Sequence, residues 1–179
     1  MIKQNIKGFT HIEVLVVVLI IGILTSIALP QYQKSVMKSR YSTLMQMVES
    51  ITEAEEVYFS TYNKYTDNFE ELDIQPSGCS LSGDKKTCVF AWGTCALNTA
   101  ADDAVSCVNN TTLKNGYAHY LTEGKYKGWK RMCWSLSGNE QDQYSKLCEL
   151  IGGTKRLGFD KVSCPPFGMC AVYSLDEWT

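Results

Sequence analysis

The 179-residue sequence contains only two histidines, His11 and His119, and none of its cysteines form a CxxC pair. Zinc sites and thioredoxin-like redox centres depend on such groupings, so the sequence disfavours both. It also lacks a phosphate-binding glycine motif, an HExxH motif and a GxSxG motif, which are common catalytic signatures. We therefore expect no enzyme activity, no cofactor and no metal ion.

Charge of one sign is not in excess. The chain has 17 lysines and arginines against 19 aspartates and glutamates, with a formal net charge of −2. A general nucleic-acid-binding protein would carry a clear positive excess. With 45% hydrophobic and 20% charged residues, the composition predicts one domain with a modest core and an appended segment.

Cysteine is the residue type that stands out. An even number of cysteines in a small chain predicts disulfides made in an oxidising, extracytoplasmic compartment. Eight cysteines allow about 105 pairings, so their number leaves the connectivity open. They are Cys79, Cys88, Cys95, Cys107, Cys133, Cys148, Cys164 and Cys170.

A long hydrophobic run lies near the N-terminus. From Val14 to Leu29 the sequence contains no charged residue. The stretch from Phe9 to Leu29 would form a helix roughly 30 Å long, which is enough to cross the hydrocarbon core of a bilayer. Glu13 stands immediately before the uncharged run. Because a carboxylate in the bilayer costs roughly 3 kcal/mol, Glu13 is expected to have a partner and a function.

Two interpretations of the N-terminus leave some of its residues unexplained. An ordinary secretory signal would use the basic start at Lys3 and Lys7, the apolar run and a cut after Ala28. Glu13 and Pro30 fit poorly beside such a signal. A plain anchor helix accounts for the apolar run but gives Glu13 no role.

A third interpretation uses all of these features. The chain begins with MIKQNIKG, which is followed by FTHIEVLVVVLIIGILTSIALPQYQ. This N-terminus resembles that of type IV pilins and pilin-like proteins, which carry a class III signal peptide. The resemblance implies that a prepilin peptidase cuts between Gly8 and Phe9, that Phe9 is N-methylated, and that the apolar helix stays attached. Glu13 would guide filament assembly by pairing with the terminal amine of a neighbouring subunit. His11 departs from the apolar residue usual in the family, and we interpret it as a tolerated substitution.

After Pro30, where the helix can kink, the apolar pattern changes from continuous to striped. Apolar residues recur in three- and four-residue steps at Met37, Tyr41, Leu44, Val48, Ile51, Tyr58 and Tyr62. This spacing predicts an amphipathic helix that continues the apolar one. The predicted organisation is a leader at 1–8, a transmembrane or filament-core helix at 9–29, its amphipathic continuation at 30–62 and a globular head at 63–179.

The head is predicted to contain strands and one short helix. Aromatic and β-branched residues bounded by turn formers mark strands at 88–92, 117–121, 129–136 and 169–175. Apolar residues on one side predict a helix at 139–151 that stops at Gly152-Gly153. An acidic cluster after the long helix lacks the EF-hand spacing of a calcium site and is expected to be a solvated loop: Asp67, Glu70, Glu71 and Asp73.

The resemblance also favours one disulfide. Cys133 is predicted on a strand and Cys148 on the following helix, and pilin-like domains often show a similar pair before a Gly-Gly stop. We therefore expect a Cys133–Cys148 bridge, which would join the helix to the sheet. Cys164 and Cys170 could close a small loop around two prolines and a glycine.

A basic and aromatic stretch at 114–131 raises the question of a ligand face. Basic groups beside aromatic rings are often found where proteins hold single-stranded nucleic acids. We prefer an ordinary hairpin with a charged outer face, and we expect His119 on the strand surface. The residues of this ligand face are Lys114, Lys125, Tyr126, Lys127, Trp129, Lys130 and Arg131, with Tyr117 and Tyr120 interleaved.

The sequence predicts an α+β, type IV pilin-like fold: a long N-terminal α-helix packed on an antiparallel β-sheet, with a disulfide-rich C-terminal region. The resemblance implies a structural pilus subunit, made as a single-pass precursor in the cytoplasmic membrane and polymerised into a surface filament for adhesion, motility or DNA uptake. Its implied partners are copies of itself or related pilins, the prepilin peptidase and the inner-membrane assembly platform, with DNA or a host surface as a further ligand. Two alternatives stay open: a pseudopilin of a type II secretion system, and a secreted binding module with an ordinary signal.

Overall fold

The structure is a computed structural model. It describes residues 10–74, 76–97, 103–109, 115–122, 130–135, 143–153, 155–157, 163–164, 168–169 and 171–175, with only the backbone for 155–157, 163–164, 168–169 and 171–172. The chain divides into two compact units, Met1–Met37 and Lys38–Thr179.

Helix α1, His11–Tyr62, runs through Pro30 without interruption. It ends where the polar stretch of the sequence begins. Asn63 has a left-handed φ of 55°, and its amide donates to the Phe59 carbonyl at 2.7 Å. A left-handed asparagine is a common helix stop, so the predicted end at Tyr62 is confirmed.

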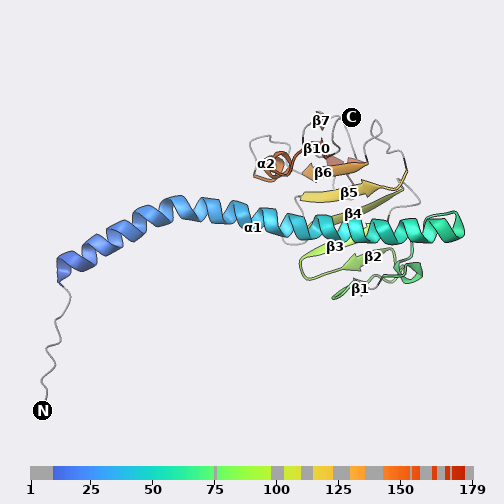
Figure 1. The fold of residues 1–179 in the computed structure, drawn as a ribbon, viewed down its shortest axis with the longest axis horizontal. Helices are drawn as coiled ribbons and strands as arrows, with labels where there is room; N and C mark the ends of the chain where they lie inside the picture. Colours follow the sequence, from blue (N-terminus) through green and yellow to red (C-terminus); the bar gives the residue numbers. More distant parts are fainter. Residues whose placement is uncertain are drawn as a thin grey trace, which may run out of the picture. The chain divides into compact units, whose positions relative to one another are not determined.

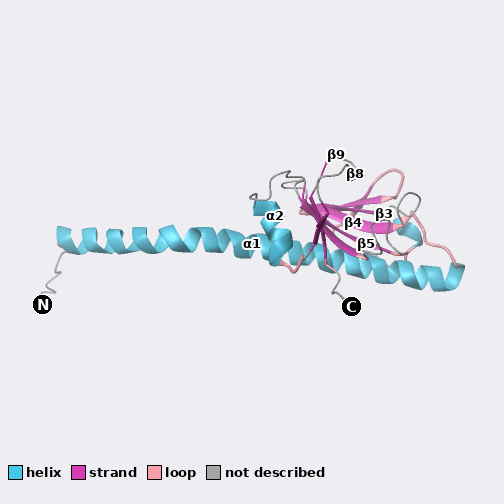
Figure 2. Ribbon diagram, turned by 90° about the horizontal axis from the view of Figure 1, so that it is seen from above, coloured by secondary structure: helices cyan, strands magenta, loops and turns pink. Residues whose placement is uncertain are grey.

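The part of α1 that belongs to the second unit packs one face on the sheet. Figures 1 and 2 show this part of the helix running along one side of the strands. Tyr62, which the pattern predicts on the buried face, is 59% exposed. The buried side chains of this part recur at helical spacing, which confirms the predicted amphipathic pattern from Tyr41 to Ile51. They are Tyr41, Leu44, Val48, Ile51, Thr52 and Glu55.

The main sheet has eight strands in the order β1-β2-β3-β4-β5-β6-β10-β7, and every neighbouring pair is antiparallel (Figure 1). A 3-10 helix, Phe69–Glu71, lies between α1 and β1 in the chain, and β8 (Ser163–Cys164) pairs with β9 (Gly168–Met169) in a separate hairpin. The strands of the main sheet are β1 (Ser80–Leu81), β2 (Thr87–Val89), β3 (Gly93–Leu97), β4 (Ala104–Asn109), β5 (Asn115–Tyr120), β6 (Arg131–Ser135), β7 (Lys155–Leu157) and β10 (Ala171–Ser174).

Two central strands, β3 and β4, are absent from the predicted strands. Their residues are mostly small and include no aromatic side chain, so the local strand signal is weak. The strand predicted at 88–92 is wrong in extent, because β2 ends at Val89. The Phe90 amide then donates to the Gly93 carbonyl at 2.7 Å, and the chain reverses into β3.

One row of fully buried residues crosses the sheet and faces α1. Strand register places each residue of the row opposite the next, so all point to the same face of the sheet. Tyr41 of α1 lies edge-on to Tyr117 of this row, with ring centroids 6.5 Å apart, and its hydroxyl donates to the Gly116 carbonyl at 2.9 Å. The row is Cys88, Cys95, Cys107, Tyr117 and Cys133, each 0% exposed.

Disulfides tie this buried row to its surroundings. The described residues form Cys79–Cys88, Cys95–Cys107 and Cys133–Cys148, with Cα atoms 5.5, 4.0 and 5.6 Å apart. The third bridge is the expected pairing, and it joins β6 to helix α2, Gln143–Leu150. The remaining pair in the sequence, Cys164 and Cys170, lies outside the side chains that the structure describes.

Helix α2 ends at the predicted pair of glycines. Gly152 has a φ of 105°, and its amide donates to the Glu149 carbonyl at 3.1 Å. The Gly153 amide donates to the Cys148 carbonyl at 2.9 Å. These two bonds form a Schellman motif, which satisfies the last carbonyls of the helix. A Cβ on Gly153 would lie 2.7 Å from the Cys148 carbonyl oxygen, so this turn requires glycine.

A substitution at Gly116 of β5 tests the packing of the sheet, because this glycine lies directly against the indole of Trp134. A Cβ at this position would stand 2.2 Å from Trp134 Cζ2. We expect Gly116→Ala to lower the free energy of unfolding by about 1–3 kcal/mol, since the ring must move in a closely packed site. Gly83→Ala is the matched control, because no atom lies within 4 Å of its added Cβ. Denaturant unfolding of the full chain in detergent measures both variants, and equal stability of the two would contradict the expectation.

Candidate functional site

The apolar part of α1 is exposed along its whole length. Every large apolar side chain from Ile12 to Leu29 is about half exposed or more, from 49% at Val16 to 73% at Ile12. The helix is also long and apolar enough to cross a membrane. A continuous apolar surface of this size marks a site of interaction with lipid or protein. This segment is therefore the first candidate site.

Glu13 caps the N-terminus of α1. The amide and the hydroxyl of Thr10 both donate to Glu13 Oε2 at 2.7 Å, and the Glu13 amide donates to Thr10 Oγ1 at 3.3 Å. This reciprocal arrangement is a capping box, which satisfies amides at the start of a helix. The Thr-x-x-Glu spacing at 10–13 is its sequence signal. Gly8 and Phe9, the predicted cleavage site, lie outside the described residues.

The hydroxyl groups within the apolar run bond to the helix itself. Thr25 Oγ1 donates to the Ile21 carbonyl at 2.6 Å, and Ser26 Oγ donates to the Ile23 carbonyl at 2.7 Å. Because polar groups inside a bilayer must be satisfied within the protein, these bonds let both residues face an apolar environment. The run thus presents little unsatisfied polar surface.

The ligand face predicted at 114–131 is only partly described. Lys130 directly precedes β6, and Arg131 is the first residue of that strand. The other residues of the predicted face lie outside the described residues: Lys114, Lys125, Tyr126, Lys127 and Trp129. The two interleaved tyrosines are buried, with Tyr117 at 0% and Tyr120 at 5% exposure. Neither ring can stack on a nucleic-acid base, so that part of the hypothesis is wrong.

His119 joins the sheet to α1, and the expectation that it lies on the strand surface is wrong. Its Nδ1 is 2.9 Å from Glu49 Oε2, and the Tyr117 hydroxyl donates to Glu49 Oε1. Its side chain is 18% exposed. Glu49 and His119 are 70 positions apart in the chain, so no local pattern predicts the contact.

Glu55 of α1 is fully buried, at 0% exposure. Its Oε2 accepts the Thr66 amide at 3.0 Å, whereas its Oε1 and the hydroxyl of Thr52 have no hydrogen-bond partner among the described residues. Burial raises the pKa of Glu55 to about 7, against an ordinary value of 4.5. The Thr66 amide opposes this rise, and the nearby carboxylates Asp67 and Glu71 add to it.

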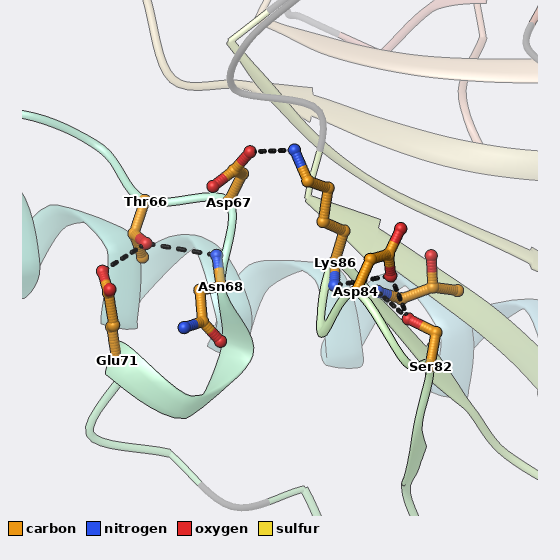
Figure 3. A network of polar contacts seen from close by, with 8 residues as sticks. Thr66, Asp67, Asn68, Glu71, Ser82, Asp84 and Lys86 are labelled. Carbon is orange, nitrogen blue, oxygen red and sulfur yellow. Dashed lines mark hydrogen bonds and ion pairs between the residues drawn. The ribbon is translucent and has the colours of Figure 1, made fainter.

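The acidic cluster after α1 is part of a polar network (Figure 3). Thr66 Oγ1 donates to Glu71 Oε2 at 2.6 Å and accepts the Asn68 amide at 3.1 Å. Asp67 forms an ion pair with Lys86, and the hydrogen bond in that pair lowers the pKa of Asp67. The expected solvated loop is thus connected to the turn between β1 and β2. Within the residues that the structure describes, no three His, Cys, Asp or Glu side chains form a metal-binding group.

The N-terminal segment matches a known family model. Residues 3–29 match the prokaryotic N-terminal methylation motif. The matched range includes Glu13 and the exposed apolar run of α1.

The curated relatives extend this similarity into the head. The chain is 31% identical over 115 residues to the type IV major pilin protein PilA of Myxococcus xanthus, which is 62% of this chain and 51% of that protein. The chain is thus similar to type IV pilins over its N-terminal segment and part of its head. It is also 36% identical over 100 residues to the type IV major fimbrial protein FimA of Dichelobacter nodosus, covering 55% and 51% of the two chains. A third relative is the type IV major pilin protein PilE1 of Neisseria gonorrhoeae, at 36% over 77 residues, or 43% and 47% of the chains.

These similarities have a limited extent. The chain spans about half the length of the curated relatives it matches, at 51%, 51% and 47%. No solved structure gives a significant match. The similarity therefore covers the N-terminal segment and part of the head, and the details of the head come from this structure.

The raised pKa of Glu55 predicts how the stability of the protein depends on pH. Its pKa is about 7 in the folded chain and 4.5 ordinarily, so the folded state binds the proton more tightly. Stability should therefore fall as the pH rises from about 4.5 to 7. We expect Glu55→Gln to weaken this fall and to be more stable than the native chain at pH 8, by up to about 3 kcal/mol.

Thermal unfolding of the full chain in detergent at pH 5 and pH 8 measures this effect. Glu53→Gln is the matched control, because Glu53 is exposed on the same helix and should keep the native pH dependence. An identical pH dependence of Glu55→Gln and the native chain would refute the expectation.

Proposed function

We propose that this protein is a structural subunit of a type IV pilus and is polymerised into a filament on the cell surface. The observation that carries the proposal is the exposed apolar surface of α1 from Ile12 to Leu29. Such a helix can reside in the membrane as a precursor, and in a filament the same helices of other subunits can cover it. The match of residues 3–29 to the N-terminal methylation motif supports the same function.

Processing of the N-terminus is part of this proposal. A prepilin peptidase would remove the leader at 1–8 by cutting between Gly8 and Phe9, and Phe9 would then be N-methylated. The peptidase and an inner-membrane assembly platform would be partners of the precursor. The motif match supports this site, as does the start of the helix cap at Thr10, which leaves Phe9 directly before the cap.

Glu13 would serve two purposes in this scheme. Within the chain it caps α1 through Oε2, which accepts both donors of Thr10. Oε1 takes part in no hydrogen bond among the described residues and is open to a further donor. The terminal amine of a neighbouring subunit's Phe9 would fill that place, because a carboxylate in an apolar surrounding is stable only when its charge is paired.

The two halves of α1 would be fitted to different surroundings. The half before Pro30 would lie in the membrane and then in the filament core, and the half after it holds the head. Pro30 has no backbone amide to donate, so one hydrogen bond of the helix is missing there. The helix can therefore bend or locally open at this point as a subunit moves from the membrane into the filament.

The first prediction from the proposed function concerns the N-terminus of the native protein. We expect the chain recovered from the native membrane or the sheared surface fraction to begin at Phe9 and, once its disulfides are reduced, to be one methyl group heavier than residues 9–179 of the sequence. Intact-mass measurement with N-terminal sequencing reads both properties. A chain that begins at Leu29 would indicate an ordinary secretory signal and would refute the filament function.

A second prediction concerns the charge of Glu13. We expect Glu13→Gln to be processed and retained in the membrane, while the filament yield in the sheared fraction falls about tenfold or more, because the amide cannot neutralise an incoming amine. Glu149→Gln, an equal change at an exposed position of α2, is the control and should assemble normally. Filaments of Glu13→Gln at the native yield would show that its charge plays no part in assembly.

A further inference from the structure

The charges on the head part of α1 are segregated along the helix. Lys38 and Arg40 lie near its start, and no other lysine or arginine occurs before Lys64. Two of the glutamates that follow are engaged with the head, and the other two, Glu53 and Glu56, are exposed. One helix therefore presents a basic end and an acidic end to its surroundings.

Arg40 stands at a groove beside α1. Trp92, in the turn between β2 and β3, is held at this groove by stacking on Phe90, with ring centroids 4.9 Å apart. Among the described residues, Arg40 has no ion pair. A guanidinium next to a fixed indole ring suits a carboxylate that lies beside an apolar group. The groove has a volume of about 400 Å³ and is lined by Arg40, Thr43, Leu44, Ala91, Trp92 and Asn109.

The acidic end offers a surface with the complementary chemistry. Glu53 is exposed, and it forms no ion pair within the described part of the chain. Glu56 accepts the Tyr65 hydroxyl at 3.2 Å through Oε1. Val57 is 59% exposed. Because residues three and four apart are neighbours on a helix, Glu53, Glu56 and Val57 form one surface, which we call the acidic patch.

The positions of the groove and the acidic patch favour a contact between copies. On a regular α-helix, Arg40 and Glu53 are separated by about 20 Å along the axis and by about 140° around it. They face in different directions, so one copy can use both surfaces at once with two different neighbours. A head-to-tail contact joins two different surfaces of neighbouring copies. It forms a ring if the rotation between copies closes and a helical filament if it does not.

We propose that the acidic patch of one copy docks into the Arg40 groove of the next copy in the filament. The Arg40 guanidinium pairs with the partner copy's carboxylate at position 53, and the valine at position 57 packs on the Trp92 ring. This inference rests on the proposed filament function. Lys38 is not part of the contact, because it lies about 160° around the helix from Arg40 and does not line the groove.

An exchange of charges in the full chain tests the contact. We expect Arg40→Glu and Glu53→Arg each to lower the yield of sheared filaments about tenfold or more, because each places like charges together. The double variant restores the opposite pairing and should recover to within about threefold of the native yield. Lys38→Glu, the same change of charge two positions from Arg40, is the matched control and should assemble normally.

Two readouts separate this inference from other effects. Removal of the leader shows that a variant is processed, and thermal unfolding in detergent shows that it is folded. If a charge-reversal variant fails either test, the neutral substitution at the same position, Arg40→Gln or Glu53→Gln, takes its place. A native chain that forms no filament would remove the proposed function and this inference with it. Native filaments together with normal assembly of Arg40→Glu, or a double variant no better than the single ones, would overturn only the docking contact.

Discussion

The exposed apolar surface of α1 between Ile12 and Leu29 is the constraint on which the rest of the molecule depends. Each large aliphatic side chain gains roughly 1.5–3 kcal/mol when it is fully buried, so this surface must be covered by lipid or by other helices. The polar groups of the segment are arranged accordingly. Thr25 and Ser26 bond to backbone carbonyls of the same helix, and Glu13 is held by its own cap.

The same helix changes its environment along its length. From Tyr41 onward it buries one stripe against a sheet whose opposing residues are cysteines and a tyrosine. These contacts are supplemented by disulfides and by the bonds of Glu49 to Tyr117 and His119. A head held in this way relies on covalent and polar contacts as well as on its core. Disulfides form and persist mainly in oxidising surroundings, which agrees with the proposed position of the subunit in a surface filament.

Several features could be predicted because they depend on residues close together in the sequence. The helix of α1, its end before Asn63 and the glycine stop after α2 follow from periodicity and turn chemistry over a few residues. The Thr10–Glu13 cap has an equally local signal that is readable at that spacing. The Cys133–Cys148 bridge was expected from family resemblance, not from spacing, since the number of cysteines leaves their pairing open.

The long helix, its apolar and amphipathic halves and the acidic residue at its start can be predicted from the sequence, because each is encoded within a few turns. The central strands β3 and β4, the contact of His119 with Glu49 and the burial of Glu55 depend on how distant parts of the chain pack together. Strand register brings together residues that are far apart in the chain. Small residues such as those of β3 and β4 become strand residues through pairing with the adjacent strands of the sheet, which a local pattern does not show. The groove at Arg40 is likewise a product of packing, since its walls come from a helix, a turn and a strand that are distant in sequence.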